Sequence, residues 1–147
     1  RGPLQDYLQL IASEVTDRQG GSVLEKETDV VFRLTYRVKQ AIRGFVPLVG
    51  VEAMGSRIFT LNAGTHDLAE GQTVSFDFIL KKHMIRPGYF QLAGGGVRGV
   101  GEWLWCDTIN QFEILGVYEE QKDRACDGYV HWRPGEVEII KKIVSKD

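Results

Sequence analysis

Apolar and polar residues alternate one for one along much of this chain, which is the pattern of a β-strand with one buried face. Residues 30–38 form the clearest such run, with valine, phenylalanine, leucine or tyrosine at every second position. Residues 73–80 repeat the pattern, and residues 7–16 carry enough of it to predict a first strand. The chain is therefore predicted to consist mainly of strands that each cover one side of a core.

A tight hairpin is predicted between two shorter strands at residues 49–53 and 58–61. The four residues between them, Met54-Gly55-Ser56-Arg57, contain a Gly-Ser pair, which is typical of short hairpin turns. No long segment combines helical spacing of apolar residues with an N-cap. Turn signals at short intervals between such strands favour a sandwich or barrel over an α/β fold. The predicted fold class is all-β, as an antiparallel β-sandwich.

A second turn signal, Pro87-Gly88, opens another predicted strand. Proline fixes φ and glycine accepts a positive φ, so this dipeptide specifies a turn. After it, Phe90 and Leu92 alternate with Tyr89 and Gln91. If Phe90 and Leu92 face the core, then Tyr89 and Gln91 face away from it.

Residues 94–101 are rich in glycine and formally match G-x-G-x-x-G, the phosphate-binding signature of dinucleotide folds. That signature needs a helix to begin at the glycines, because the amides of the helix N-terminus bind the phosphate. Here the run continues into Trp103-Leu104-Trp105, where bulky aromatics stand in place of a helix. We therefore expect residues 94–101 to form a loop or hairpin rim, and we expect no nucleotide site.

Composition excludes several classes of function. The chain has 147 residues, which suits one domain, and its formal net charge of −2 gives no basic field for nucleic acid or anionic lipid. No apolar run approaches the roughly 18 residues of a membrane span. The chain begins with Arg1 rather than methionine, so we expect an excised domain. Cys106 and Cys126 are expected to be free thiols of a cytosolic protein, with a single pair as the alternative.

Catalytic and metal-binding patterns are weak. His66, His83 and His131 are far apart in the sequence and share no ligand spacing with either cysteine. No serine lies in G-x-S-x-G, and no G-x-x-x-x-G-K-[ST] sequence occurs. Carboxylates are numerous, but nothing selects a pair for glycoside hydrolysis. We therefore expect no catalytic residues, no metal and no cofactor, with a small glycosidase-like enzyme as the weakest alternative.

The C-terminal segment differs from the rest of the chain. Residues 119–124 form a charged cluster, and an apolar strand is predicted at 137–144. The apolar residues of that strand are Val137, Ile139, Ile140 and Ile143. We expect a sandwich core at 1–120, followed in the same domain by a charged connector and terminal strand at 121–147. A soluble monomer does not leave such a strand as a free edge, so it pairs within its own sheet or with a neighbouring subunit. We expect the second arrangement, a homodimer joined by strand exchange.

Several segments, taken in their order and spacing, carry a family resemblance. They are Val31-Phe32-Arg33-Leu34-Thr35-Tyr36-Arg37-Val38, Val49-Gly50-Val51, Gly55-Ser56-Arg57-Ile58-Phe59-Thr60-Leu61-Asn62, Val74-Ser75-Phe76-Asp77-Phe78, Pro87-Gly88-Tyr89-Phe90-Gln91-Leu92, and Trp105 through Phe112-Glu113-Ile114. Together they resemble the C-terminal carbohydrate-binding domain of the ATP-binding subunit of bacterial O-antigen polysaccharide ABC exporters, the Wzt type. The resemblance covers roughly residues 7–143.

This resemblance implies an immunoglobulin-like β-sandwich that recognises the modified non-reducing end of an undecaprenyl-diphosphate-linked O-polysaccharide. It also implies dimers that exchange C-terminal strands, with the exporter's nucleotide-binding and transmembrane subunits as further partners. The implied location is cytoplasmic, peripheral to the inner membrane through the transporter.

Sugar binding needs exposed aromatic rings beside planar polar side chains, because a pyranose presents a C–H face and hydroxyl groups. The candidate residues are Arg33, Tyr89, Gln91, Trp103, Trp105, Arg98 and Asn62. We expect Arg33, Tyr89 and Gln91 on one sheet face, bordered by the two tryptophans. The structural alternatives are a solvated face for Arg33, core positions for the tryptophans, and bonds to turn backbone for Asn62 and His66.

Two functions therefore remain open. The first is a carbohydrate-binding module that selects finished polysaccharide chains for export. The second is a sandwich used only for protein interaction or dimerisation. Exposed aromatics beside arginines on one sheet face favour the first, and smooth polar faces favour the second.

Overall fold

The computed structural model describes residues 4–82, 84–117 and 137–146, the last range by its backbone. In chain order the elements are α1 (Leu4–Tyr7), β1 (Leu8–Thr16), β2 (Leu24–Glu25), β3 (Val30–Val38), β4 (Ile42–Ala53), β5 (Ser56–Asn62), β6 (His66–Leu68), β7 (Gln72–Leu80), β8 (Gly88–Arg98), β9 (Glu102–Leu115) and β10 (Val137–Lys146). Within these residues no helix is both long and apolar enough to cross a membrane.

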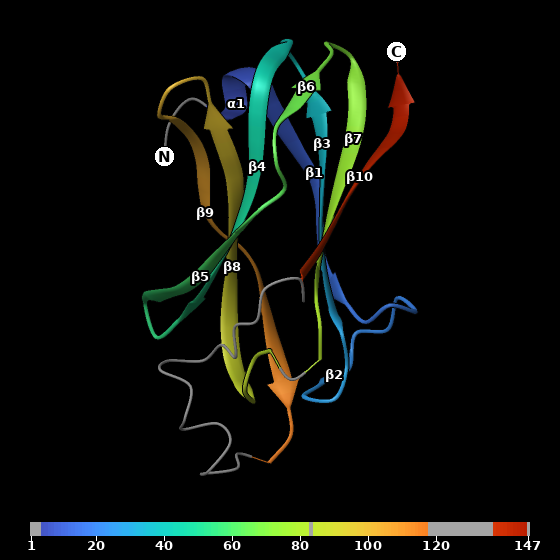
Figure 1. Ribbon diagram of the computed structural model, residues 1–147, viewed down its shortest axis with the longest axis vertical. Helices are drawn as coiled ribbons and strands as arrows, with labels where there is room; N and C mark the ends of the chain where they lie inside the picture. Colours follow the sequence, from blue (N-terminus) through green and yellow to red (C-terminus); the bar gives the residue numbers. More distant parts are fainter. Residues whose placement is uncertain (1–3, 83, 118–136, 147) are drawn as a thin grey trace.

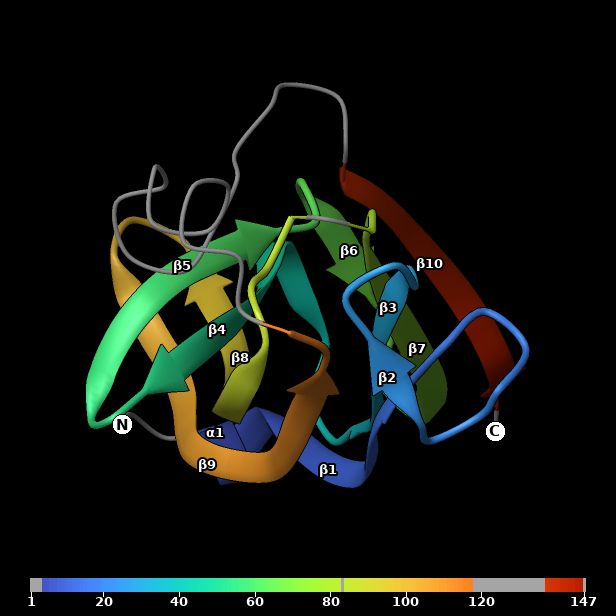
Figure 2. The same cartoon turned by 90° about the horizontal axis from the view of Figure 1, so that it is seen from below.

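The strands form two sheets that face each other across the core (Figures 1 and 2). One sheet has four strands in the order β1-β3-β7-β10. The other has six, in the order β2-β9-β8-β4-β5, with β6 paired to β4. The pairings are antiparallel, apart from the short parallel contact of β2 with β9. This arrangement confirms the predicted all-β antiparallel sandwich.

The alternation of side chains along β3 shows how the core is built. In β3, Phe32, Leu34 and Tyr36 are each at most 1% exposed, while the residues between them point outward and are half-buried. Burying a large apolar side chain contributes roughly 1.5–3 kcal/mol, so this parity is strongly fixed. The rings of Phe32 and Phe112 meet edge to face at 5.4 Å between centroids and join the two sheets. The core therefore decides which side chains of each strand remain for the outer surface.

The predicted hairpin between β4 and β5 is confirmed. Its two turn residues are Met54 and Gly55, with φ of 53° and 82°. Two successive positive φ values are typical of a type I′ turn, whose twist matches that of antiparallel strands. The turn therefore lies one residue earlier than the Gly-Ser pair noted in the sequence.

The prediction of a loop or hairpin rim at residues 94–101 is wrong for residues 94–98 and is confirmed only for the hairpin turn after them. Residues 94–98 continue β8 and are largely buried, and only Gly99, Val100 and Gly101 form the turn. A Cβ on Gly95 would meet the carbonyl of Leu104, and one on Gly96 would meet Phe45. The glycines are needed for close packing rather than for a flexible loop. A strand, β9, follows the turn, so the helix required for a dinucleotide site does not begin there.

The strands β1 and β4 begin at other residues than predicted. The first begins at Leu8, because the residues before it form the short helix α1. The other, β4, begins at Ile42, seven residues before the predicted start. Gly44 and Pro47 interrupt the alternation in this part of β4, which hides it from a periodicity argument.

The C-terminal strand β10 lies beside β7 at the edge of the four-stranded sheet (Figure 1). Its register runs from Val137 opposite Leu80 to Lys146 opposite Gln72. In this single chain β10 therefore pairs with its own sheet. Exchange with a second subunit would form the same ladder and stays a prediction. The charged cluster at 119–124 lies outside the described residues, as do Cys126, His83 and His131.

Candidate ligand-binding face

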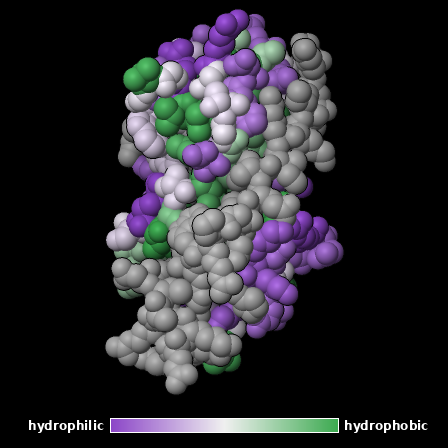
Figure 3. Space-filling model, in the orientation of Figure 1, coloured by the Kyte–Doolittle hydropathy of each residue, from purple (hydrophilic) through white to green (hydrophobic). Residues whose placement is uncertain are grey.

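The outer surface of the six-stranded sheet carries the candidate residues of β8. Tyr89 is 78% exposed and Gln91 is also exposed, whereas Phe90 and Leu92 are at most 2% exposed. The predicted orientation of this strand is therefore confirmed. Hydrophobic residues also reach the surface in the upper half of Figure 3, where Figure 1 draws β4, but β8 begins at Gly88 in the lower half, so that patch is separate from Tyr89 and Gln91.

Register brings three polar side chains of neighbouring strands beside these two residues. On β9, Glu113 lies opposite Tyr89, and Gln111 lies opposite Gln91. On β4, Glu52 lies opposite Gln91 from the other side. Directly opposed side chains in antiparallel strands are in contact distance, so these residues form one continuous polar row across three strands.

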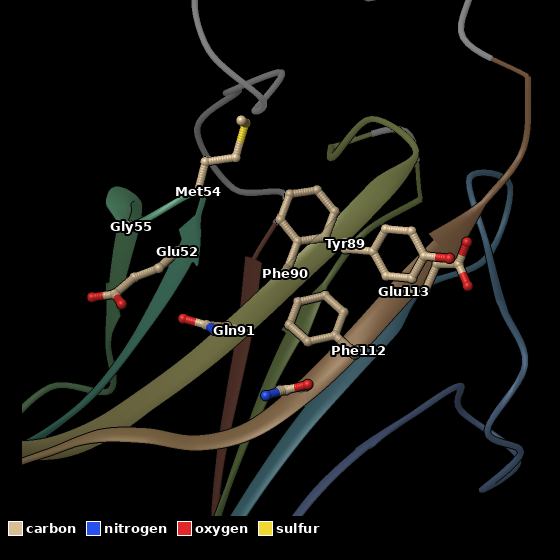
Figure 4. Close-up of a pocket in the computed structure, with 9 residues that line it drawn as sticks. Glu52, Met54, Gly55, Tyr89, Phe90, Gln91, Phe112 and Glu113 are labelled. Carbon is tan, nitrogen blue, oxygen red and sulfur yellow. The ribbon is translucent and has the colours of Figure 1, made fainter.

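A pocket of about 450 Å³ opens at this place, beside the β4–β5 turn. It is lined by Glu52, Met54, Gly55, Tyr89, Phe90, Gln91, Gln111, Phe112 and Glu113, and we name it the acidic pocket. Figure 4 shows the Tyr89 ring beside the Glu113 carboxylate. Beneath the pocket, on the core side of the sheet, the rings of Phe90 and Phe112 stack with their centroids 5.4 Å apart. The pocket combines an exposed aromatic ring, the exposed Met54 side chain and four polar side chains, and such a mixture of apolar and polar groups is usual in a small-molecule site.

A second aromatic cluster lies farther along the same face, on β9. The rings of Trp103 and Trp105 pack edge to face with their centroids 6.0 Å apart. Trp103 is 52% exposed, and Trp105 is half-buried. The guanidinium carbon of Arg57 lies 5.0 Å from the centroid of the Trp105 ring, within the range of a cation–π contact.

Arg57 connects the two clusters. Its Nη2 lies 3.1 Å from the Glu52 carboxylate, and its Nη1 donates a hydrogen bond of 2.8 Å to Thr60. The side chain crosses the sheet over Gly50, where any Cβ would meet the guanidinium. Gly50 therefore makes room for an arginine that touches the acidic pocket at one end and Trp105 at the other.

A bulge in β9 positions the tryptophan cluster. Three residues of β9 stand opposite a single residue of β8, between Cys106 and Asn110. Within it, Thr108 has a φ of 50°, a conformation that β-branched residues rarely adopt. Asn110 donates a hydrogen bond of 2.9 Å to the carbonyl of Ser13, and the Ser13 hydroxyl donates one of 3.0 Å to the carbonyl of Ile109. These bonds tie the bulge to β1 in the other sheet and hold its strained conformation in place.

The prediction that Arg33 shares this face is wrong. Arg33 points outward as expected, but β3 belongs to the four-stranded sheet. There it donates hydrogen bonds of 2.7 and 2.8 Å to the two carboxylate oxygens of Asp77, which raises the pKa of the guanidinium. The alternation of residues shows which side chains of a strand point away from the core, but it does not show which sheet the strand joins. Here β3 pairs with β1 and β7 rather than with β8.

Arg98 and Asn62 are held in structural contacts. At the end of β8, the Arg98 guanidinium bonds to Glu102 at 2.7 Å and lies 4.3 Å from the ring centroid of Tyr7. Its contacts therefore lead toward α1 and away from the acidic pocket. The Asn62 side chain accepts a hydrogen bond of 2.9 Å from the Gly64 amide, and His66 Nε2 lies 2.7 Å from the Ala63 carbonyl. Both residues thus satisfy turn backbone.

Sequence reasoning missed the residues that complete the face. Glu113 follows from alternation alone, since Phe112 and Ile114 beside it are apolar. The roles of Glu52 and Arg57 depend on how β4, β5 and β9 pair, which no local pattern reveals. Within the described ranges, no group of three histidine, cysteine or acidic residues could hold a metal ion.

Comparison with known proteins supports the fold. No protein-family model matches this chain, and no curated protein matches it. Among solved structures, the crystal structure of the C-terminal domain of Wzt is similar, with a TM-score of 0.57 and 13% sequence identity. The alignment covers 78% of this chain and 68% of that chain. The chain therefore has a Wzt-like β-sandwich fold.

Proposed function

We propose that this domain is a non-catalytic carbohydrate-binding module, and that sugar binds on the outer face of the six-stranded sheet. The observation that carries the proposal is the gathering of exposed aromatics on that one face. Tyr89 and Trp103 are more than half exposed, and polar side chains that hydrogen-bond hydroxyl groups stand beside them. An aromatic ring stacks on the C–H face of a pyranose, while carboxylates and amides bind its hydroxyls.

The same observation favours sugar binding over a module that serves protein interaction alone. A smooth polar face would suit the second function. Here apolar rings stay exposed to solvent next to Arg57 and two carboxylates, although burying them in the core would be favourable.

The proposed ligand is the modified non-reducing end of a lipid-linked O-antigen polysaccharide that an ABC transporter exports. The family resemblance carried by the sequence segments supports this ligand, and the fold shared with the C-terminal domain of Wzt agrees with it. The partners would be the nucleotide-binding and transmembrane subunits of the exporter. The domain would then work in the cytoplasm, at the inner membrane.

The test of this function is a titration with polysaccharide. A shallow site with one or two stacked rings and a few hydrogen bonds gives a binding free energy of about 4–8 kcal/mol, that is, a Kd of roughly micromolar to millimolar. Calorimetry should show this affinity for oligosaccharides with the natural terminus. If oligosaccharides of internal repeats bind equally well, the domain does not read the terminus.

We also propose that the domain forms a homodimer by exchange of β10. The position of β10 at the sheet edge supports this, because a partner's strand can take the same place on β7. Deleting residues 134–147 should give monomers or aggregates in sedimentation analysis. A full-length chain that sediments as a monomer at high micromolar concentration would contradict the exchange.

A further inference from the structure

We propose that the acidic pocket selects a terminal sugar that carries no acidic group, and that it rejects polysaccharide ends bearing a carboxylate or phosphate. This inference rests on the proposed carbohydrate-binding function and adds the chemical class of the ligand. It starts from the size of the pocket. At about 450 Å³ the pocket lies in the lower part of the range of small-molecule sites, which suits the end of a chain rather than a long stretch of it.

The charge of the lining is negative. Among the described residues that line the pocket, the charged side chains are Glu52 and Glu113, and none is a lysine, arginine or histidine. Arg57, just outside the pocket, lies 3.1 Å from Glu52 and above the Trp105 ring. Its charge is therefore shared with Glu52, and within the described residues no ion-pair partner lies at Glu113. Glu113 is half-buried, so solvent screens its charge only in part.

The hydrogen-bonding capacity of the lining points the same way. An ionised carboxylate only accepts hydrogen bonds, whereas the amides of Gln91 and Gln111 and the hydroxyl of Tyr89 both donate and accept. The pocket as a whole thus accepts more bonds than it donates. Sugar hydroxyls and amino groups supply donors, while carboxylate and phosphate oxygens do not. A negatively charged terminus would meet both electrostatic repulsion and an excess of acceptors.

The remaining lining favours the body of a sugar ring. Tyr89, 78% exposed, offers an aromatic face to the pocket (Figure 4). Met54 at the rim is 95% exposed and adds adaptable apolar surface. A neutral pyranose can stack on this surface while its hydroxyls reach the carboxylates. An acidic sugar of the same shape can stack equally well, so only the charge distinguishes the two.

The experiment compares matched glycans that differ in one group. The probes are glucose-, galactose- and mannose-terminated oligosaccharides, each prepared as the neutral sugar, the 2-amino sugar and the uronic acid. Binding is measured on the full chain by glycan array and then by calorimetry. In at least one series the neutral terminus should bind, the amino sugar should bind at least as tightly, and the uronic acid should bind at least about tenfold more weakly. The difference should shrink as salt is added.

Two variants connect this selectivity to the pocket. Glu113→Gln keeps the shape of the side chain and removes its charge, so it should reduce the discrimination against uronic acids severalfold. Glu70→Gln makes the same charge change at an exposed position outside the pocket and should leave the discrimination unchanged. Equal binding of neutral and acidic ends, or a Glu113→Gln variant with unchanged selectivity, would overturn the inference while sugar binding itself stands. Absence of binding both to every probe and to the oligosaccharides with the natural terminus would instead overturn the proposed function, and this inference with it.

Discussion

The two outer faces of the sandwich each contain a hollow of similar size. In the hollow of the four-stranded sheet the polar side chains bond to groups of the protein itself, whereas in the acidic pocket more of them stay open to solvent. The acidic pocket on the six-stranded sheet measures about 450 Å³, and a hollow beside Arg33 on the four-stranded sheet measures about 430 Å³. In the second, Arg33 and Asp77 bond to each other through two hydrogen bonds. The Asp17 carboxylate there accepts bonds from two backbone amides of its own loop.

Other polar side chains on and beside the four-stranded face also bond to one another. The hydroxyls of Thr35 and Ser75 lie 2.9 Å apart, and Arg18 pairs with Asp29 at 2.7 Å. Although burial alone would raise it, bonds from Arg18 and a backbone amide hold the pKa of Asp29 below its usual value. Polar groups that satisfy one another gain little from a ligand, because binding would first have to break those bonds. In the acidic pocket Tyr89 is exposed and Glu113 is half-buried, so a ligand can contact them without first breaking bonds within the protein.

The largest effect is expected from Tyr89→Ala on the six-stranded face. Binding of terminal oligosaccharide should fall at least about tenfold, since stacking on the ring is lost. Stability should change by no more than about 0.5 kcal/mol, because the side chain is 78% exposed and fills no core position. Calorimetry and thermal unfolding measure the two effects separately.

The control for Tyr89→Ala is Ile11→Ala, an exposed apolar residue on β1 in the other sheet. It should change neither binding nor stability appreciably. A Tyr89→Ala variant that melts several degrees lower and still binds sugar would reverse the distinction between the two faces.

Asp77→Ala on the four-stranded face should have a smaller effect than Tyr89→Ala. It should lower the stability of the fold and leave sugar binding unchanged. The change leaves Arg33 without its bidentate partner and should cost about 1–2 kcal/mol in the free energy of unfolding. Urea denaturation measures this cost. Sugar affinity should stay within experimental error of the unchanged chain. If Asp77→Ala loses sugar binding while its fold stays intact, the ligand binds the four-stranded sheet and our assignment to the six-stranded sheet is wrong.

Much of the fold was predictable because alternation is a local property. A strand turns successive side chains to opposite sides whatever it pairs with, so the outward direction of Tyr89, Gln91 and Arg33 followed from their apolar neighbours. The type of fold followed from the same period and from the turn signals. The glycine run misled the prediction, because glycine favours both a flexible loop and a close contact between strands.

The candidate site was less predictable because it depends on register and on sheet order. Arg33 was assigned to the wrong face for this reason, while Glu113 and Arg57 were missed. Pairing of β8 with β9 puts Glu113 beside Tyr89, and pairing of β4 with β5 brings Arg57 to Glu52. These contacts join residues far apart in the sequence, so no local pattern encodes them.

The sequence by itself therefore determined that this chain is an all-β sandwich, and which side of each clearly alternating strand faces the core. The hydrophobic effect acts on each strand separately and leaves a period of two in the sequence. Only the tertiary structure decided which outward side chains meet. It placed Tyr89 and Glu113 in one pocket and Arg33 on the opposite face. Hydrogen bonds between strands decide which side chains become neighbours, and the order of residues along the chain does not show how the strands pair.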